Sequence, residues 1–343
     1  MAESGGYWLN LAEAQKLSQT HLVPGIVEEN VRRGGILDRF PLAQPTGTSI
    51  TWNRENAERE GKEVGVGAQL KWSNDITYTQ ISTELKIIYD QTPLDKFVAS
   101  VYGTFNNYEA TMLRGMKKGM WRRAEDRIIY GDTSFSTGSL QFDGLHAWAY
   151  DNGVKGSSNM DIDEAGPLSL ANLRLLEDEM KLGTDFILMP YTIARRIDAF
   201  YQEVGSTVSN RSAIGSFLWD TNAIGKRVPF WNGIEIVRSD YMVAEQAGTG
   251  EGSDAMAKYT SGTQEYSIFM VKLGQVMEGE GGMTLGFGGD THQGGEIFRT
   301  TFFPALEDYD ASGLRLTSYI GMLAGSTFSV GRIYGITDAA ITE

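Results

Sequence analysis

The residues that most often carry out chemistry in proteins are few in this chain and lie far apart. His21, His146 and His292 stand in segments of different character, and none has the HExxH spacing that brings two imidazoles to one zinc ion. The chain has no cysteine, which excludes disulfides, thiolate metal sites and cysteine nucleophiles. We therefore expect no metal site, no cofactor and no enzymatic activity.

Three other patterns partly match known sites. The glycine-rich stretch Glu278–Asp290 has acidic residues where a phosphate would be repelled and does not join a strand to a helix, so we interpret it as a mobile loop. The segment Asp308–Gly313 matches the first half of a calcium loop, but Tyr319 takes the place of the required glutamate. Acidic pairs such as Asp161 and Asp163 leave glycosidase chemistry open, because that chemistry depends on carboxyl separation in space.

The net charge of −14 argues against a surface built to bind nucleic acid. One predicted helix, Thr104–Tyr130, is the exception, since one of its faces is basic. The basic residues that a contact with DNA would use are Arg114, Lys117, Arg122 and Arg123, with Lys118 and Arg127 beside them. Two interpretations stay open: this face contacts DNA, or it is solvated and balanced by acidic residues at helical spacing.

The other face of the same helix is apolar. Its stripe consists of Phe105, Tyr108, Met112, Met116, Met120, Ala124 and Ile128, which recur every three or four residues. We expect this stripe to pack on the chain's own sheet. Gly131 follows directly and is predicted to end the helix in a left-handed conformation.

A long hairpin is predicted from the strands Thr48–Arg54 and Asp75–Tyr89. The polar, glycine-rich segment between them is too long for a tight turn and too polar to form a core. Because a two-stranded ribbon is only marginally stable alone, we expect its apolar residues Trp52, Trp72 and Ile81 to contact a neighbouring subunit.

The first 45 or so residues are interpreted as an arm. Short helices are predicted at Asn10–Ser18 and from Pro24 to Gly34-Gly35. Helices of this length are marginal in isolation, so the arm should lie on a larger surface.

The remainder alternates helices and strands, which predicts an α+β chain. Helices are predicted at 168–181 and 192–202, and strands at 186–189, 230–237, 266–273, 296–303, 315–323 and 327–336. No apolar run approaches the roughly 18 residues that span a bilayer, and the start lacks a signal-peptide pattern, so we expect no membrane association.

Several sequence segments, taken in their order along nearly the whole chain, resemble those of one protein family. These are ILDRFPLAQPTGTSITWNRE at Ile36–Glu55, the long helix ending in IIYGD and continuing to LQFDGL, DFILMPYTIARRIDAF at Asp185–Phe200, and FWNGIEIVRSDYM. Together they resemble the major capsid proteins of tailed bacteriophages with the Hong Kong 97 fold. The resemblance implies an N-terminal arm (1–45), an extended hairpin or E-loop (46–90), a peripheral domain with a spine helix (91–150 and 283–325) and an axial domain (151–282 and 326–343).

By this resemblance, the chain assembles with itself into the hexamers and pentamers of an icosahedral head in the virion. That head encloses double-stranded DNA without sequence-specific binding and is assembled in the host bacterial cytoplasm. A separate scaffolding protein and a portal protein at one vertex are expected partners, and a decoration protein is a further candidate. Lys62 and Lys71 lie in the E-loop, where some relatives form Lys–Asn crosslinks, but no crosslink is expected here.

Two alternatives to a phage capsid protein stay open. One is an encapsulin-like nanocompartment shell, and the other, from another class, is a β-rich hydrolase or glycan-binding protein with an acidic cleft.

Overall fold

The computed structural model describes residues 31–45, 47–57, 60–70, 72, 76–102, 108–133, 140–152, 160–207, 217–221, 227–246, 258–288, 297–307 and 309–342. The helices are α2 (Lys96–Tyr102), α3 (Tyr108–Tyr130), α4 (Leu145–Asn152), α5 (Leu170–Glu179) and α6 (Tyr191–Thr207), with short 3-10 helices η1 (Leu37–Arg39), η4 (Val276–Glu278) and η5 (Thr327–Ser329). The strands are β1 (Leu42–Ala43), β2 (Ser49–Ala57), β3 (Thr77–Glu84), β4 (Lys86–Asp95), β5 (Asp161–Ser169), β6 (Phe186–Pro190), β7 (Phe217–Thr221), β8 (Arg227–Trp231), β9 (Ile234–Ser239), β10 (Glu245–Gln246), β11 (Gln264–Val271), β12 (Met283–Phe287), β13 (Arg299–Phe303), β14 (Ala311–Ala324) and β15 (Val330–Thr342).

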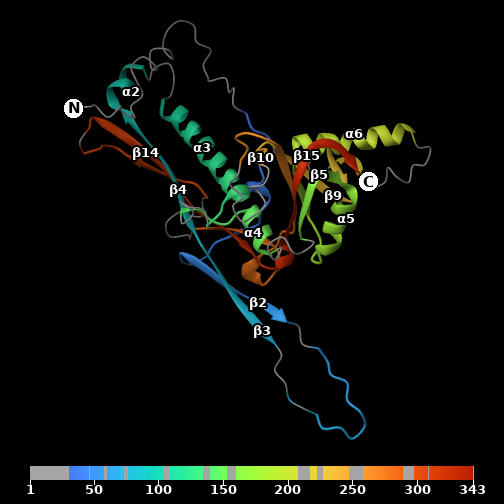
Figure 1. Ribbon diagram of the computed structural model, residues 1–343. Helices are drawn as coiled ribbons and strands as arrows, with labels where there is room; N and C mark the ends of the chain where they lie inside the picture. Colours follow the sequence, from blue (N-terminus) through green and yellow to red (C-terminus); the bar gives the residue numbers. More distant parts are fainter. Residues whose placement is uncertain are drawn as a thin grey trace.

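A five-stranded sheet is built along the long strand β14. The strand order is β1-β12-β14-β13, and β4 pairs antiparallel with β14 over its whole length. Helix α3 lies along this sheet (Figure 1). Its residues Met116 and Met120 pack against leucines of both strands, Leu94, Leu314 and Leu316. The predicted apolar stripe is therefore confirmed where the helix is described, and its partner is the chain's own sheet.

Helix α3 ends at Tyr130 as predicted, but not by the predicted mechanism. Gly131 does not have a positive φ. A Cβ at this position would lie 2.2 Å from the carbonyl oxygen of Phe142 and 2.5 Å from that of Arg127. Glycine is thus required because the segment before α4 crosses the helix end at close range. The predicted helix start at Thr104 lies outside the described residues.

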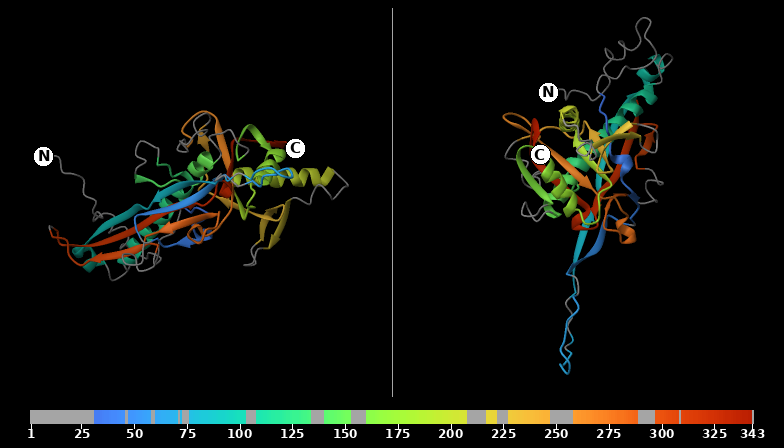
Figure 2. Two further views of the ribbon diagram at one scale, coloured as in Figure 1. Left: turned by 90° about the horizontal axis from the view of Figure 1, so that it is seen from below. Right: turned by 90° about the vertical axis from the view of Figure 1, so that its right-hand side faces the viewer.

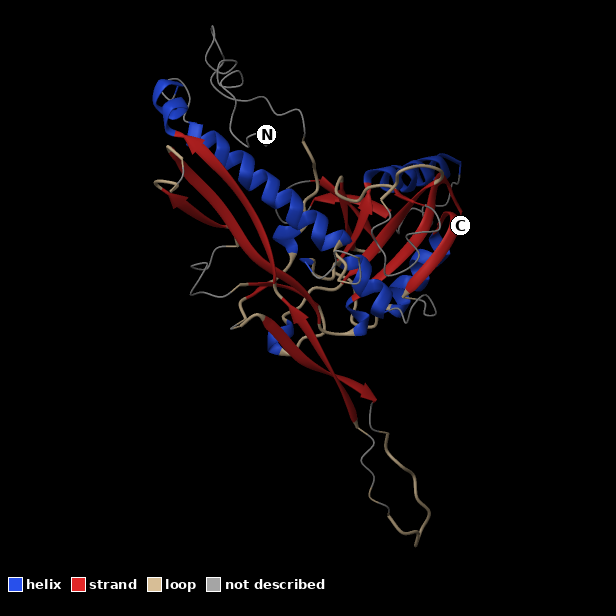
Figure 3. Cartoon of the chain, turned by 60° about the vertical axis from the view of Figure 1, so that its left-hand side comes forward, coloured by secondary structure: helices blue, strands red, loops and turns tan. Residues whose placement is uncertain are grey.

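The second sheet has eight strands in the order β5-β15-β11-β6-β9-β8-β7, with β10 beside β11. Helices α5 and α6 pack on it through residues such as Leu176 and Ile197, and Figure 3 shows these helices beside the red strands. The predicted strand 230–237 is wrong, because residues 227–239 form the hairpin β8–β9. Asn232 and Gly233 take the two positive φ angles of its turn.

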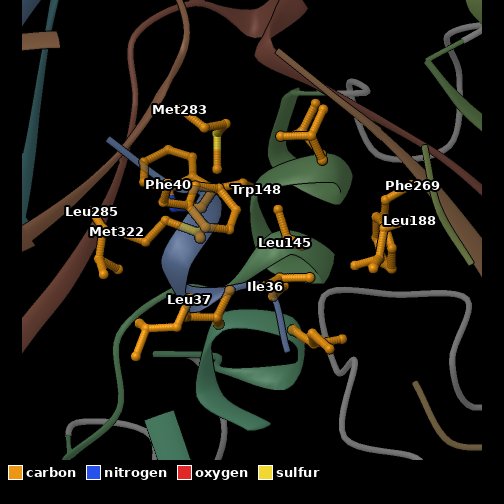
Figure 4. Packing of buried hydrophobic residues seen from close by; sticks show 14 of the residues in the cluster. Ile36, Leu37, Phe40, Leu145, Trp148, Leu188, Phe269, Met283, Leu285 and Met322 are labelled. Atoms are coloured by element: carbon orange, nitrogen blue, oxygen red, sulfur yellow. The ribbon is translucent and has the colours of Figure 1, made fainter. Parts of the chain in front are cut away.

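The main hydrophobic cluster joins the two sheets. Figure 4 shows Met283, Leu285 and Met322 from the first sheet close to Trp148 of α4, with Leu188 and Phe269 of the second sheet on the far side of Leu145. The other labelled members are Ile36, Leu37 and Phe40. The last part of the predicted arm therefore belongs to the chain's own core. The arm helix predicted at Asn10–Ser18 and the first part of the second one lie outside the described residues. The second helix was predicted to continue to Gly34-Gly35, but residues 31–36 form no helix, so that end of the prediction is wrong. The core is continuous between the two sheets and does not mark a boundary between them. The division into peripheral and axial domains stays a prediction.

The interpretation of residues 278–290 as a mobile loop is wrong. Met283–Phe287 forms strand β12, which is buried at every residue and lies between β1 and β14. Its side chains Met283, Leu285 and Phe287 alternate with Thr284 and a glycine, which is the pattern of a strand. This alternation is only five residues long and is flanked by glycines, which favoured the prediction of a loop over that of a strand.

The predicted hairpin is present as the antiparallel pair β2–β3, which projects from the body as a ribbon (Figures 1 and 2). Its second strand does not continue to residue 89. The chain leaves the ribbon at Leu85, whose N–H donates to the carbonyl of Thr48 at 2.9 Å. It then enters the five-stranded sheet as β4.

Candidate functional site

The base of the ribbon is fixed on the body by apolar packing. Trp52 of β2 faces Ile81 of β3 across the pair, and both contact the main hydrophobic cluster. The Trp52 ring centroid lies 6.3 Å from that of Trp148 on α4. Trp52 and Ile81 therefore have apolar partners within the chain, contrary to the premise of the prediction. Their contact with a neighbouring subunit stays a prediction.

A partly buried cation reinforces this attachment. Arg54 of β2 donates from Nε to the carbonyl of Gly325 at 2.9 Å and from Nη2 to the carbonyl of Ala324. Its guanidinium also lies 5.8 Å from the Trp148 ring centroid. Burial lowers the pKa of Arg54 to about 10, so the side chain remains charged at neutral pH. The ribbon is thus tied to the end of β14 by main-chain acceptors.

The tip of the ribbon has the opposite character. Trp72 and Val66 are fully exposed, and Leu70 is 73% exposed. Lys62 is exposed in the same segment, whereas the predicted contact residue Lys71 lies outside the described residues. An exposed tryptophan with neighbouring aliphatic side chains is unusual on a monomer and marks an interaction surface.

The basic residues of α3 do not form one surface. Arg114 and Lys117 are exposed, whereas Arg122 is half-buried and hydrogen-bonds Tyr241. Arg123 is exposed and follows Arg114 by nine residues, which at 3.6 residues per turn places it about half a turn away. The four predicted DNA-facing residues therefore divide between different sides of the helix.

Arg123 instead lines a groove between α3 and the edge strand β4, here called the α3–β4 groove. It has a volume of about 400 Å³ and is lined by Lys86, Ile87, Ile88, Tyr89, Arg123, Arg127, Leu140, Gln141 and Phe142. Ile87, Tyr89 and Leu140 are each more than half exposed. Burial, together with the neighbouring Arg123, lowers the pKa of Arg127. The groove therefore combines apolar walls with positive charge.

The incoming chain is held on the other side of α3 by a buried carboxylate. Glu125 accepts hydrogen bonds from the backbone N–H groups of Ile36 and Leu37, all at 2.9 Å. Burial raises the pKa of Glu125 although these two donors oppose the shift. The segment from Ile36 onward is thus fixed at the start of η1, while Val31 before it is exposed.

A buried polar cluster connects α4 to the second sheet. Arg332 binds Asp161 through two hydrogen bonds of 2.7 and 3.0 Å, and its Nη1 lies 3.0 Å from Nδ1 of His146. A guanidinium only donates, so Nδ1 accepts and the imidazole proton is on Nε2. Nε2 lies 2.8 Å from Glu245, off the line of a regular hydrogen bond. The Ser267 hydroxyl also donates to Glu245 at 2.7 Å.

These contacts leave Asp161 and His146 inaccessible to a substrate, which the alternative function of a hydrolase would require. Asp161 is fully enclosed with Arg332 and has no access to a substrate, and His146 is fully buried. His21 and His292 lie outside the described residues.

Within the described ranges there is no group of three or more His, Asp or Glu side chains able to hold a metal ion. The part of the chain that the structure describes also contains no helix long and apolar enough to cross a membrane.

Comparisons with solved structures find the same fold in shell proteins. The holo-SrpI encapsulin complex from Synechococcus elongatus matches with a TM-score of 0.64 and 11% identity, over 98% of both chains. The capsid of Myoviridae phage XM1 matches with a TM-score of 0.58 and 11% identity, over 97% of this chain and 100% of that one. The capsid of the native GTA particle gives 0.57 and 11%, over 98% of both chains.

No protein-family model and no curated protein sequence matches the chain. Identities near 11% establish the fold alone. The expected α+β capsid-type fold is confirmed at that level, and the match covers nearly the whole chain.

Proposed function

We propose that this chain is the major capsid protein of a tailed bacteriophage. It builds hexamers and pentamers of an icosahedral head that encloses double-stranded DNA, and it acts as a structural protein and not as an enzyme. Its site of action is the virion, after assembly in the host bacterial cytoplasm. A separate scaffolding protein, a portal protein at one vertex and a candidate decoration protein complete the set of proposed partners.

The observation that carries this proposal is the ribbon tip. Trp72, Val66 and Leu70 lie at the end of a segment that projects beyond the body, with no surface of the described chain to cover them. Covering such a group releases water from apolar surface and is favourable by roughly 25 cal/mol per Å². A second copy supplies that cover in a closed assembly, where every subunit both gives and receives a ribbon.

Fewer basic residues of α3 are proposed to face DNA than the sequence predicted. Arg114 and Lys117 are exposed on one side of α3 and are the residues proposed to face the genome. Arg122 contacts Tyr241 and Arg123 lines the α3–β4 groove. A few basic side chains on an acidic protein would bind DNA weakly and without sequence preference.

The second candidate is an encapsulin-like shell that encloses protein cargo. The observation that favours it is the match to the Synechococcus elongatus encapsulin, which covers 98% of both chains. The fold is shared between the two kinds of shell, so the content of the particle distinguishes them.

The experiment is to express the chain with and without a candidate scaffolding protein from the same genome and to image the products by electron microscopy. Closed shells support a shell protein, and shells that need the scaffold and protect DNA from nuclease support the phage assignment. Shells that form alone around protein cargo support the encapsulin alternative. A protein that stays monomeric under all conditions, and binds a small ligand saturably, contradicts both.

A further inference from the structure

A pocket with aromatic and arginine side chains lies between the first turns of α6 and the strands β7, β8 and β9, and is here called the α6–β9 pocket. It has a volume of about 330 Å³. Its apolar part consists of the buried residues Ala194, Pro229 and Ile236, and its rings are those of Tyr191 and Trp219. This size, and apolar surface combined with a few polar groups, are typical of sites that bind small ligands.

Arg238 of β9 is positioned in this pocket by the two rings. Its guanidinium lies 5.3 Å from the ring centroid of Tyr191 and 5.2 Å from that of Trp219. A guanidinium over aromatic rings keeps its in-plane N–H groups as donors, in a fork that matches the two oxygens of a carboxylate. In the part of the chain that the structure describes, no carboxylate pairs with Arg238 and no acceptor binds its side chain.

The two rings are themselves held by other contacts. Tyr191 also has the guanidinium of Arg33 4.5 Å from its ring centroid, and Arg33 pairs with Asp240 at 3.3 Å. Trp219 donates from Nε1 to the Asp198 carboxylate at 3.0 Å. The groups around Arg238 are therefore in place before a ligand arrives, which lowers the entropic cost of binding.

The charges of the pocket favour a ligand with a single negative charge. The lining contains Arg195 and Arg238 against Asp198, a balance of +1 (two minus one). Arg195 lies 3.5 Å from Asp338, which Arg196 binds more closely at 2.6 Å. One carboxylate would balance the lining, whereas a phosphate dianion would bring a second negative charge near Asp198 and be repelled.

We infer that the α6–β9 pocket binds a small organic carboxylate, with its two oxygens at Arg238 and its apolar body against Pro229 and Ile236. The body covers apolar side chains and removes them from water. Such a ligand connects α6 to β9 and to the hairpin β7–β8, because the lining comes from all of these elements. The inference goes beyond the proposed function and is independent of it, since a single chain supplies all of these residues.

Benzoate is the probe, because it joins one carboxylate to an apolar ring. The unassembled full chain is prepared with 5-fluorotryptophan, so that its fluorine NMR spectrum reports on the seven tryptophans. Trp219→Phe and Trp72→Phe identify two of the resonances. Benzoate should shift the Trp219 resonance saturably, with a Kd of about 1 mM or lower, and leave the resonance of the distant Trp72 unchanged.

Substitution of the arginine tests the carboxylate contact. Arg238→Met keeps an unbranched side chain beside the rings but removes the charged donors, and should raise the Kd of benzoate by about tenfold or more. Arg238→Lys keeps the charge without the fork and should also weaken binding, so the test does not depend on one variant folding. Arg174→Met is the matched control, because Arg174 lies 5.8 Å from the Trp231 ring centroid outside the pocket, and should leave the Kd unchanged.

Two further probes separate the parts of the ligand. Acetate lacks the apolar body and should bind about tenfold more weakly than benzoate. Phenyl phosphate has the same ring but carries nearly two negative charges at about pH 7.5, and should also bind more weakly. Tighter binding of phenyl phosphate would overturn the assignment to a carboxylate.

Two other results would overturn the inference. One is the absence of a saturable shift at Trp219, and the other is a Kd that neither Arg238 variant changes. Closed shells provide a last comparison. If they exclude benzoate while the unassembled chain binds it, an acidic side chain of a neighbouring copy fills the pocket, and the assignment to a free small molecule is wrong. Failure of benzoate binding leaves the proposed function intact, since that function is tested by shell formation.

Discussion

The two ends of the β2–β3 ribbon differ sharply, although they belong to one hairpin. At the base, Trp52 and Ile81 lie on the main core and Arg54 is bound to carbonyls of residues 324 and 325. At the tip, Trp72 and Val66 contact nothing in the described chain. The base is therefore part of the fold, and the tip can be stabilised only by another molecule.

This difference separates folding from assembly within one element. A substitution at the base should affect the stability of the single chain, whereas one at the tip should affect only its association. Variants at the two ends of the ribbon and in the body test this separation.

Trp52→Ala should lower the free energy of unfolding by about 3 kcal/mol, because it removes a large partly buried ring that packs on Trp148 and leaves a cavity. Urea denaturation of the unassembled chain measures the change. Trp72→Ala is the matched control, since it removes the same side chain from solvent. Equal losses for the two variants would show that the base is not part of the fold.

Arg54→Ala should lower the free energy of unfolding by about 2 kcal/mol. Two carbonyl groups, those of Ala324 and Gly325, lose their charged donor in a partly buried place. Arg114→Ala, which removes an exposed arginine from α3, should change stability by less than about 0.5 kcal/mol. If the Arg54 and Arg114 variants are equally stable, the ribbon is not held by this cation.

Acid should weaken the body through Glu245 and leave the tip unaffected. Burial favours a raised pKa for Glu245, but the facing His146, Ser267 and Arg332 outweigh it, and the pKa lies below its ordinary value of 4.5. The ionised form therefore stabilises the fold fully above 4.5, and this contribution is lost as the pH falls through the lowered value.

Comparing the wild type with Glu245→Gln by urea denaturation at several pH values measures this contribution. The stability gap between the two proteins should be constant above pH 4.5 and narrow below it. Glu60→Gln at the exposed ribbon tip is the control and should show no gap at any pH. A gap for Glu245→Gln that does not change with pH would show that the ionised carboxylate does not stabilise the fold.

Trp72→Ala should have the smallest effect on stability, less than about 0.5 kcal/mol, because the ring is fully exposed. Its effect should appear instead in assembly, where the yield of closed shells seen by electron microscopy falls strongly. Trp72→Phe keeps an apolar ring and should recover much of the yield. Normal shells from the alanine variant would remove the tip from the subunit contact.

The features that could be read from the sequence are those whose signal is local. The apolar stripe that includes Met116 and Met120 predicted helix α3 and its buried face, because helical periodicity is a property of residues close in the sequence. The hairpin and most strands followed from alternation in the same way. For the candidate site, the sequence identified Trp72 as exposed and apolar, since its polar surroundings offer no core.

Other features depended on which distant segments meet. Nothing near Trp52 in the sequence shows that Trp148 lies against it, nor that Arg123 and Leu140 line one groove. The same holds for Gly131, where the crossing of another segment, and not a left-handed turn, requires glycine.

The sequence by itself thus determined the composition of the elements: an acidic α+β chain without cysteine, one long amphipathic helix and a ribbon whose tip has no core of its own. Tertiary structure alone decided which apolar residues are covered within the chain and which remain for a neighbour. The physical reason is that hydrophobic burial depends on area removed from water by any partner, near or far in the sequence. Local patterns record that a residue needs cover but not where that cover comes from.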